Sequence, residues 1–441
     1  MRDLAELNWN DGAEAVLALL PRLTVLRGML KTEPVRALGA CCSAVLDGDI
    51  RRAAEEVFSL TSALLSGGYR RVTGDLFKDF LLHELLLEPH PFAVNAASNR
   101  LDEALYSGIK EDMEILAALA GLDGETLYRY VQERFKELRQ KARPSRDSAA
   151  RLAEAAWGGS AVRPEPAEEP KPVKNLPAFL PGGAPNWQYG EEELRDSYVA
   201  DEALEEMYHR FLEGGLEWQT MAEDVWNFFA AYGTGVFLKH RLFCWQNGRL
   251  DPIEDARQPL GPAVMEREYL EARSHVIEFM RDNGAEPMLI SGPAGMGKTN
   301  MLFSLADELP ELRFVYVPGP NGLEGLAPLF DLIKGQPLKF MVALDEPKSL
   351  DLALRALPVN VLVAAASSDP ELAGAASFTK KITLPQLRLD GFTDIVQALI
   401  DFEGAGVPRE RVRSACVDHQ VDSRGELTVA AAVSVARALK G

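Results

Sequence analysis

The sequence has few cysteines and no apolar run long enough to cross a bilayer. The four cysteines of the 441-residue chain include no C-x-x-C pair and no Cys/His grouping at metal-ligand spacing. We therefore expect reduced thiols and a cytoplasmic location, without a disulfide framework or a zinc site. The first residues also lack the cationic start and apolar block of a signal peptide, so we expect no membrane partner.

Positive charge is also scarce. The chain has 47 Lys and Arg against 66 Asp and Glu, a formal net charge of -19. A large non-specific contact with nucleic acid needs clustered basic residues, so the composition disfavours such a partner, although a local basic patch stays possible. With 47% hydrophobic residues the chain is globular, and its length predicts two or three domains.

One stretch carries a complete G-x-x-x-x-G-K-[ST] phosphate loop. An apolar run, 288–290, precedes it, and apolar residues at helical spacing follow it, which is the strand, loop and helix context that the motif needs. Its backbone N–H groups and the helix N-terminus favour phosphate. We expect ATP or ADP with Mg²⁺ as cofactors. The predicted nucleotide-binding residues are Gly292, Pro293, Ala294, Gly295, Met296, Gly297, Lys298, Thr299 and Asn300.

The second half of the expected site is the apolar segment 339–346, which ends in Asp345 and Glu346 about fifty residues after the phosphate loop. It is typical of a Walker B strand. We expect Thr299 and Asp345 to hold Mg²⁺, Lys298 to pair with the β- and γ-phosphates, and Glu346 to orient or deprotonate the attacking water.

The pattern along the chain predicts five regions. Residues 1–142 have helical periodicity and form an all-α N-terminal domain. Residues 143–190 are rich in proline and form a linker. Residues 191–260 are helical and aromatic, and we expect a connector that packs on the next domain; the alternative is that its aromatic side chains stack on a ligand. Residues 261–389 alternate strand and helix, and residues 390–441 form a helical lid.

The alternating region predicts a parallel α/β sheet with helices on both faces and ligands at the carboxyl ends of the strands. We expect strands at Met288–Ser291, Phe314–Val317, Phe340–Asp345, Val359–Ala366 and Ile382–Leu384. The lid is expected to contain helices at Phe392–Phe402, Arg409–Val417 and Leu427–Leu439.

Together, the Walker pair, the strand ending at Ser368 and the terminal lid resemble the AAA+ class of P-loop ATPases. Further segments are similar to a bacterial AAA+ ATP-binding family that is classed as a domain of unknown function. They are residues 85–92, 232–237, 245–250 with 252–253, and 266–267. The resemblance implies nucleotide chemistry and gives almost nothing about biological role.

Three departures from the AAA+ pattern stand out. Ser368 takes the place of a polar sensor that is commonly Asn, and we expect it to substitute in part as a catalytic residue. Ser377 stands where the resemblance leads us to expect an arginine finger, with Arg355 and Arg388 as possible replacements. In the lid, Glu426 occupies the expected second-sensor arginine position, and Arg424 is nearby. Missing arginines predict slow turnover.

Three functions fit these residues. The first is an ATPase that couples its nucleotide cycle to movement of the lid and the N-terminal domain on a macromolecular partner, which we expect to be a protein. The second is an ATP-binding switch or scaffold with little or no hydrolysis. The third is a small-molecule or nucleoside kinase, against which the Asp345-Glu346 strand end and the long lid argue. An oligomer is possible, but the sequence shows no evident arginine finger for it.

Overall fold

The computed structural model separates into two compact units, which we call the helical unit and the sheet unit. The described residues up to 96 and from 100 to 229 form the helical unit, and residues 97–99 with those from 230 onward form the sheet unit. The residues described are 9–141, 180, 183–190, 201–215, 217–253, 265–281, 286–319, 325–348, 357–374, 377–402, 404–422 and 427–440. None of the described helices is both long and apolar enough to span a bilayer.

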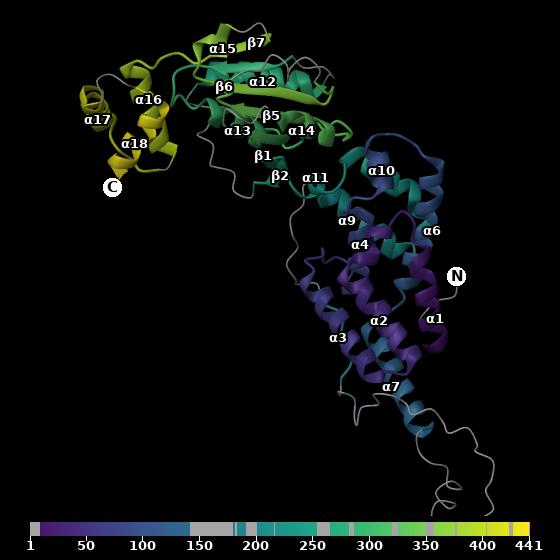
Figure 1. Ribbon diagram of the computed structural model, residues 1–441. Coiled ribbons are helices and arrows are strands. Elements are labelled where there is room, and N and C mark those ends of the chain that lie inside the picture. Colours follow the sequence, from purple (N-terminus) through teal and green to yellow (C-terminus); the bar gives the residue numbers. More distant parts are fainter. Residues whose placement is uncertain are drawn as a thin grey trace, which may run out of the picture. The chain divides into compact units, whose positions relative to one another are not determined.

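The helical unit confirms the predicted all-α N-terminal region (Figure 1). Its helices are α1 (Trp9–Leu19), η2 (Leu20–Arg22), η3 (Arg27–Lys31), α2 (Glu33–Asp47), α3 (Ile50–Ser66), α4 (Leu76–Leu86), α5 (Pro91–Ala97), α6 (Glu103–Leu119), α7 (Gly124–Lys141), α9 (Asp201–Glu213), η4 (Trp218–Met221) and α10 (Ala222–Tyr232). Aspartates begin four of these helices by accepting hydrogen bonds from the first free N–H groups: Asp49, Asp75, Asp102 and Asp123.

The segment predicted as one connector, residues 191–260, divides between the two units. Its described part up to residue 229 packs in the helical unit: the Trp226 ring lies 5.6 Å from that of Phe92, and the Phe229 ring lies 5.6 Å from that of His90. Only its later part joins the sheet unit. The aromatic density therefore reflects two separate cores, and the change of unit falls between Phe229 and Ala230, near the end of α10.

The end of the segment predicted as a proline-rich linker packs on the helical unit. Residues 143–179 lie outside the described residues, but residues 183–190 pack on the helical unit. Trp187 is 1% exposed, its ring lies 5.4 Å from that of Phe77, and its Nε1–H donates to Thr61 Oγ1 at 2.9 Å. The backbone pairs as well, because Leu76 N donates to Trp187 O at 2.9 Å. One buried aromatic residue thus fixes a segment whose composition suggested a linker.

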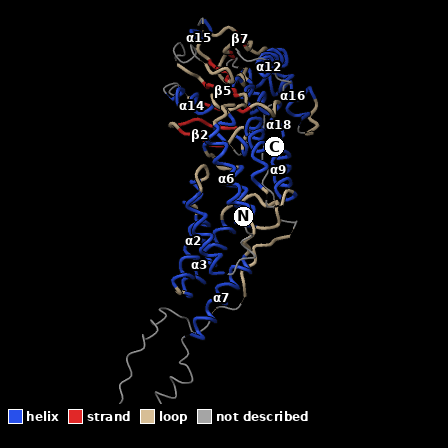
Figure 2. Tube along the Cα trace, turned by 90° about the vertical axis from the view of Figure 1, so that its right-hand side faces the viewer, coloured by secondary structure: helices blue, strands red, loops and turns tan. Residues whose placement is uncertain are grey.

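The sheet unit contains all seven strands assigned in the described residues, shown in red in Figure 2. They are β1 (Leu242–Gln246), β2 (Arg249–Pro252), β3 (Met288–Ser291), β4 (Arg313–Val317), β5 (Phe340–Asp345), β6 (Val361–Ser367) and β7 (Lys380–Thr383), in the order β2-β1-β4-β5-β6-β3-β7. All neighbours are parallel except β1 and β2. The five predicted strands are confirmed: two have the predicted ends, and the ends of the other three differ by one or two residues.

Alternate residues of the central strands feed two cores, one on each face of the sheet. On β5, Met341 and Ala343 join the core that includes helices α12 (Glu266–Arg281) and α13 (Lys298–Glu308), whereas Val342 and Leu344 join the core that includes α14 (Leu326–Ile333). This period of two, with both faces covered, explains why the strand is an unbroken apolar run. The short helices α11 (Val236–Lys239) and α15 (Pro370–Gly374) complete the layers.

The predicted lid is confirmed as three helices at the C-terminal end. They are α16 (Leu389–Phe402), α17 (Arg409–Asp422) and α18 (Val429–Lys440), and they share the α12/α13 core through residues such as Phe392, Val412 and Ala432.

The hairpin of β1 and β2 forms one edge of the sheet. In the turn between these strands, Asn247 and Gly248 have φ values of 54° and 74°. Two successive positive φ values produce the tight hairpin turn that Asn-Gly favours.

Candidate functional site

The phosphate loop connects the end of β3 to the first residue of α13, at the carboxyl edge of the sheet. Gly295 and Gly297 have φ values of 76° and 85°, which side chains with a Cβ rarely adopt. A Cβ on Gly295 would also lie 3.3 Å from Thr428 of the lid region. Glycine at this position therefore serves both the curvature of the loop and its close approach to the lid.

Lys298 is the only loop side chain with a positive charge, and it is 4% exposed. Its Nζ donates to the carbonyl oxygens of Gly292 at 3.1 Å and Pro293 at 3.0 Å, and to Ser368 Oγ at 2.7 Å. It also lies 3.5 Å from Glu346 Oε1. An ammonium group has three N–H donors, so all three have acceptors here, and an incoming phosphate would have to replace one of them.

Asp345 and Thr299, the two residues predicted to hold Mg²⁺, lie in direct contact. Thr299 Oγ1 donates to Asp345 Oδ1 at 2.6 Å. A third group, Tyr316 on β4, donates its hydroxyl to Asp345 Oδ2 at 2.8 Å. A hydroxyl and a carboxylate oxygen at the edge of a cavity are the hard donors that Mg²⁺ prefers, together with water and phosphate oxygens. The donor set therefore fits that ion. Among the described residues no group of three or more His, Cys, Asp or Glu side chains forms a separate metal site.

Glu346 has a backbone φ of 45°, which is unusual for a residue other than glycine. Its N–H donates to Ala366 O at 2.8 Å, so β6 holds this conformation. Its carboxylate accepts from Ser368 N at 2.7 Å and from Ser368 Oγ at 2.7 Å. Partial burial tends to raise the pKa of Glu346, but the hydrogen bonds from Ser368 and the charge of Lys298 outweigh burial and lower that pKa below its ordinary value.

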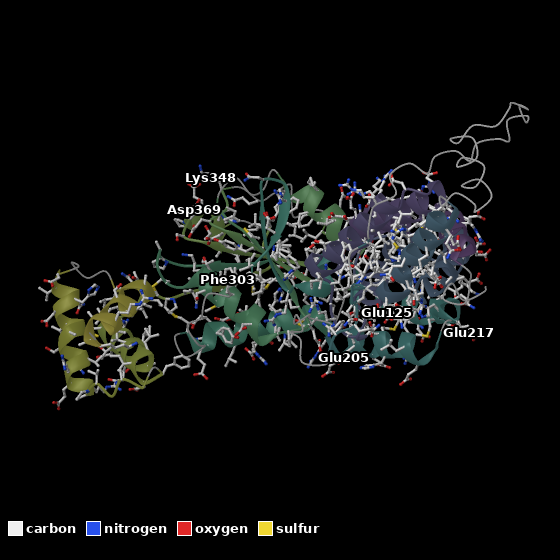
Figure 3. The ribbon with its side chains drawn as sticks, turned by 90° about the horizontal axis from the view of Figure 1, so that it is seen from below. Glu125, Glu205, Glu217, Phe303, Lys348 and Asp369 are labelled. Atoms are coloured by element: carbon white, nitrogen blue, oxygen red, sulfur yellow. The ribbon has the colours of Figure 1, made fainter. Side chains whose placement is uncertain are left out.

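Ser368 thus bridges the two charged residues of the site. Its hydroxyl accepts from Lys298 and donates to Glu346, because β6, which leads to Ser368, lies between β3 and β5 in the sheet. Asp369 directly follows Ser368, and Lys348 lies two residues after Glu346. Figure 3 labels Asp369 and Lys348, and both lie on the same side of the sheet unit.

A cavity of about 490 Å³ opens beside these residues. It is lined by Ala294, Gly295, Gly297, Lys298, Thr299, Asn300, Phe303, Asp345, Glu346, Val429 and Ala430. Three predicted nucleotide-binding residues do not line it: Gly292 and Pro293 accept from Lys298 through their carbonyl groups, and Met296 is buried in the core. Ser368 reaches the site through Lys298 and Glu346.

Sequence reasoning missed four residues at the site. Phe303 lies four residues after Thr299 on α13, so helical spacing could have indicated it. Tyr316, Val429 and Ala430 carry no motif, and only the fold brings them here. The lid contacts the loop directly, because Ala430 N donates to Gly295 O at 3.0 Å.

Of the candidate arginines, only Arg388 belongs to the part of the chain that the structure describes. Among the described residues no arginine lines the cavity, and Arg388 is exposed just after β7. Arg355, Arg424 and Glu426 lie outside the described residues.

Solved structures that resemble part of this chain include the following three. RuvB from Thermotoga maritima, a Holliday junction branch migration motor, is 15% identical over 41% of this chain and 74% of its own, with a TM-score of 0.28. PCH-2 from C. elegans is 15% identical over 40% of this chain and 63% of its own, with a TM-score of 0.30. Hsp104, solved with ATPγS and casein, is 18% identical over 40% and 38%, with a TM-score of 0.29.

Comparisons by sequence found no relative. No protein-family model matches the chain, and no curated protein matches it. The narrower bacterial family therefore stays a prediction.

Proposed function

We propose that this chain is a nucleotide-binding protein of the AAA+ type that hydrolyses ATP slowly with Mg²⁺. The observation that carries the proposal is the bridge from Lys298 through Ser368 to Glu346 at the edge of the cavity. It brings a phosphate-binding cation and a candidate base together from the phosphate loop and the strand that ends in Asp345. Hydrolysis of this kind relies on positioning and charge neutralisation, which are what such side chains supply.

Each side chain has a distinct role in this proposal. Lys298 exchanges its bond to Ser368 for a phosphate oxygen, and the backbone N–H groups of the loop bind the remaining phosphate charge. Glu346 orients a water molecule and accepts its proton. Thr299 and Asp345 would hold Mg²⁺, which would neutralise charge on the β- and γ-phosphates when bound.

The lid supports a further part of the proposal. The hydrogen bond from Ala430 N to Gly295 O joins α18 to the loop. A movement of the loop on phosphate binding would therefore also move the lid. We propose that this movement acts on a protein partner and involves the helical unit.

A second candidate function is an ATP-binding switch with little hydrolysis. It is favoured by one observation: among the described residues no arginine lines the cavity to stabilise the transition state. Steady-state phosphate release from Mg-ATP, measured beside ATP affinity, separates the two. Turnover that needs Mg²⁺ supports the ATPase, whereas tight binding without release above background supports the switch.

Ser368→Ala is expected to raise the pH at which hydrolysis is lost on the acidic side. The variant removes the hydroxyl bond to Glu346 and keeps the backbone bond, so the pKa of Glu346 rises toward its ordinary value. A base must be ionised, so activity disappears as the pH falls through that pKa, and it disappears at a higher pH in the variant. The measurement is the pH dependence of kcat/KM.

The matched control for this profile is Ser367→Ala. Ser367 is the preceding residue, and its hydroxyl accepts from Asp369 N without contacting Glu346. The acidic limb of the kcat/KM profile of Ser367→Ala should coincide with that of the wild type. A Ser368→Ala limb that also coincides with wild type would show that Ser368 does not set the protonation of the base.

A further inference from the structure

Tyr316 is held at the edge of the site by the framework of the sheet. It is the fourth residue of β4, and its Cα pairs with Ala343 of β5, two residues before Asp345. Its ring lies 5.3 Å from that of Phe303, which lines the cavity. Strand register and ring packing together place its hydroxyl 2.8 Å from Asp345 Oδ2.

Both oxygens of the Asp345 carboxylate are engaged, each by a different hydroxyl. Thr299 Oγ1 donates to Oδ1 and Tyr316 donates to Oδ2. An ionised carboxylate only accepts hydrogen bonds, so the direction of both is settled. Two bonds from opposite oxygens fix the rotation of the carboxylate about its terminal torsion, which is otherwise broad.

We propose that Tyr316 is a positioning residue for the cation site, one that fixes the Asp345 carboxylate in the orientation that suits Mg²⁺. This inference rests on the proposed function. Thr299 and Asp345 are both candidate donors to the ion, so Thr299 can give up its bond to Asp345 in favour of that ion. Tyr316 is not among the residues predicted to hold the ion, and its hydrogen bond to Asp345 Oδ2 orients the carboxylate whether or not Thr299 keeps its own bond. Partners of this kind typically change metal affinity 10–100-fold when removed.

The test measures ADP affinity by calorimetry for the full chain, in EDTA and at a series of MgCl₂ concentrations. Tyr316→Phe keeps the ring and its packing on Phe303 but removes the hydroxyl. We expect the same ADP affinity as wild type in EDTA, which also shows that the variant is folded. MgCl₂ is expected to increase the ADP affinity of both proteins. The MgCl₂ concentration that gives half of this increase should be about tenfold higher for Tyr316→Phe than for the wild type.

Tyr269→Phe is the matched control. Tyr269 lies on α12 in the same unit, is buried, and donates its hydroxyl to a carboxylate, that of Glu308, which does not line the cavity. Its Mg²⁺ dependence should equal that of the wild type.

Three results would overturn the inference. An unchanged Mg²⁺ dependence in Tyr316→Phe would overturn it alone. An equal loss of ADP affinity with and without Mg²⁺ would show that Tyr316 has a structural role only. Wild-type protein that binds no ADP would overturn the proposed function, and this inference with it.

Discussion

Glu346→Gln is expected to reduce ATP turnover at least about a hundredfold while ATP still binds, because a positioned general base contributes roughly 10²- to 10⁴-fold. Glutamine keeps the size of the side chain and its capacity to accept from Ser368 N, but it cannot take a proton from water at neutral pH. The phosphate loop and Lys298 are unchanged in this variant. The measurement is single-turnover phosphate release from Mg-ATP beside ATP affinity.

Glu371→Gln supplies the control for this loss. Glu371 is an exposed carboxylate on α15 that does not line the cavity. The same loss of charge there should leave turnover unchanged. Turnover that survives in Glu346→Gln would mean that another group activates the water, and release that is already at background in wild type would favour the nucleotide switch.

Trp187→Ala is expected to destabilise the helical unit by about 3–5 kcal/mol, the usual cost of truncating a buried aromatic residue to alanine. Trp187 is 1% exposed and its ring lies 5.4 Å from that of Phe77. Its removal leaves Thr61 Oγ1 without the Nε1–H donor. Replacement also removes the side chain that fixes residues 183–190 on the unit. The measurement is chemical unfolding of the full chain, followed by circular dichroism. The helical unit of the variant should unfold at a lower denaturant concentration than that of the wild type.

The comparison variant is Leu101→Ala in the same unit. Leu101 is 68% exposed, so its loss should change the unfolding free energy by no more than about 0.5 kcal/mol. If Trp187→Ala unfolds at the same denaturant concentration as wild type, residues 183–190 do not contribute to the stability of the helical unit.

Sequence patterns predict the centre of the sheet unit well because local chemistry determines it. The loop glycines, the buried run Met341–Leu344 and the Asp345-Glu346 pair each need no distant partner to be recognised. The pairing of β1 with β4 is different. It depends on which edge of the sheet is free, and no local pattern of residues 242–246 encodes that choice.

The same distinction applies to the site and to the boundaries between regions. Ser368 was recognisable from its place after a strand, but its bridge between Lys298 and Glu346 depends on the strand order. Tyr316 and Ala430 reach the site only through tertiary packing. At Trp187 the composition was not enough: proline content predicted a linker over residues 143–190, and the burial of this one aromatic side chain near its end depends on tertiary packing.

The most direct test of the central claim, that the cavity at the phosphate loop binds nucleotide, is ADP and ATP affinity in wild type and Lys298→Ala with Mg²⁺ present. The lysine supplies a charge-assisted hydrogen bond worth roughly 1.5–3 kcal/mol, so the variant should bind about 10- to 100-fold more weakly while the backbone cradle remains. Lys348→Ala, which removes an exposed lysine outside the cavity lining, should bind as wild type. A folded Lys298→Ala protein with wild-type affinity, or a wild-type protein that binds neither nucleotide, would contradict the account.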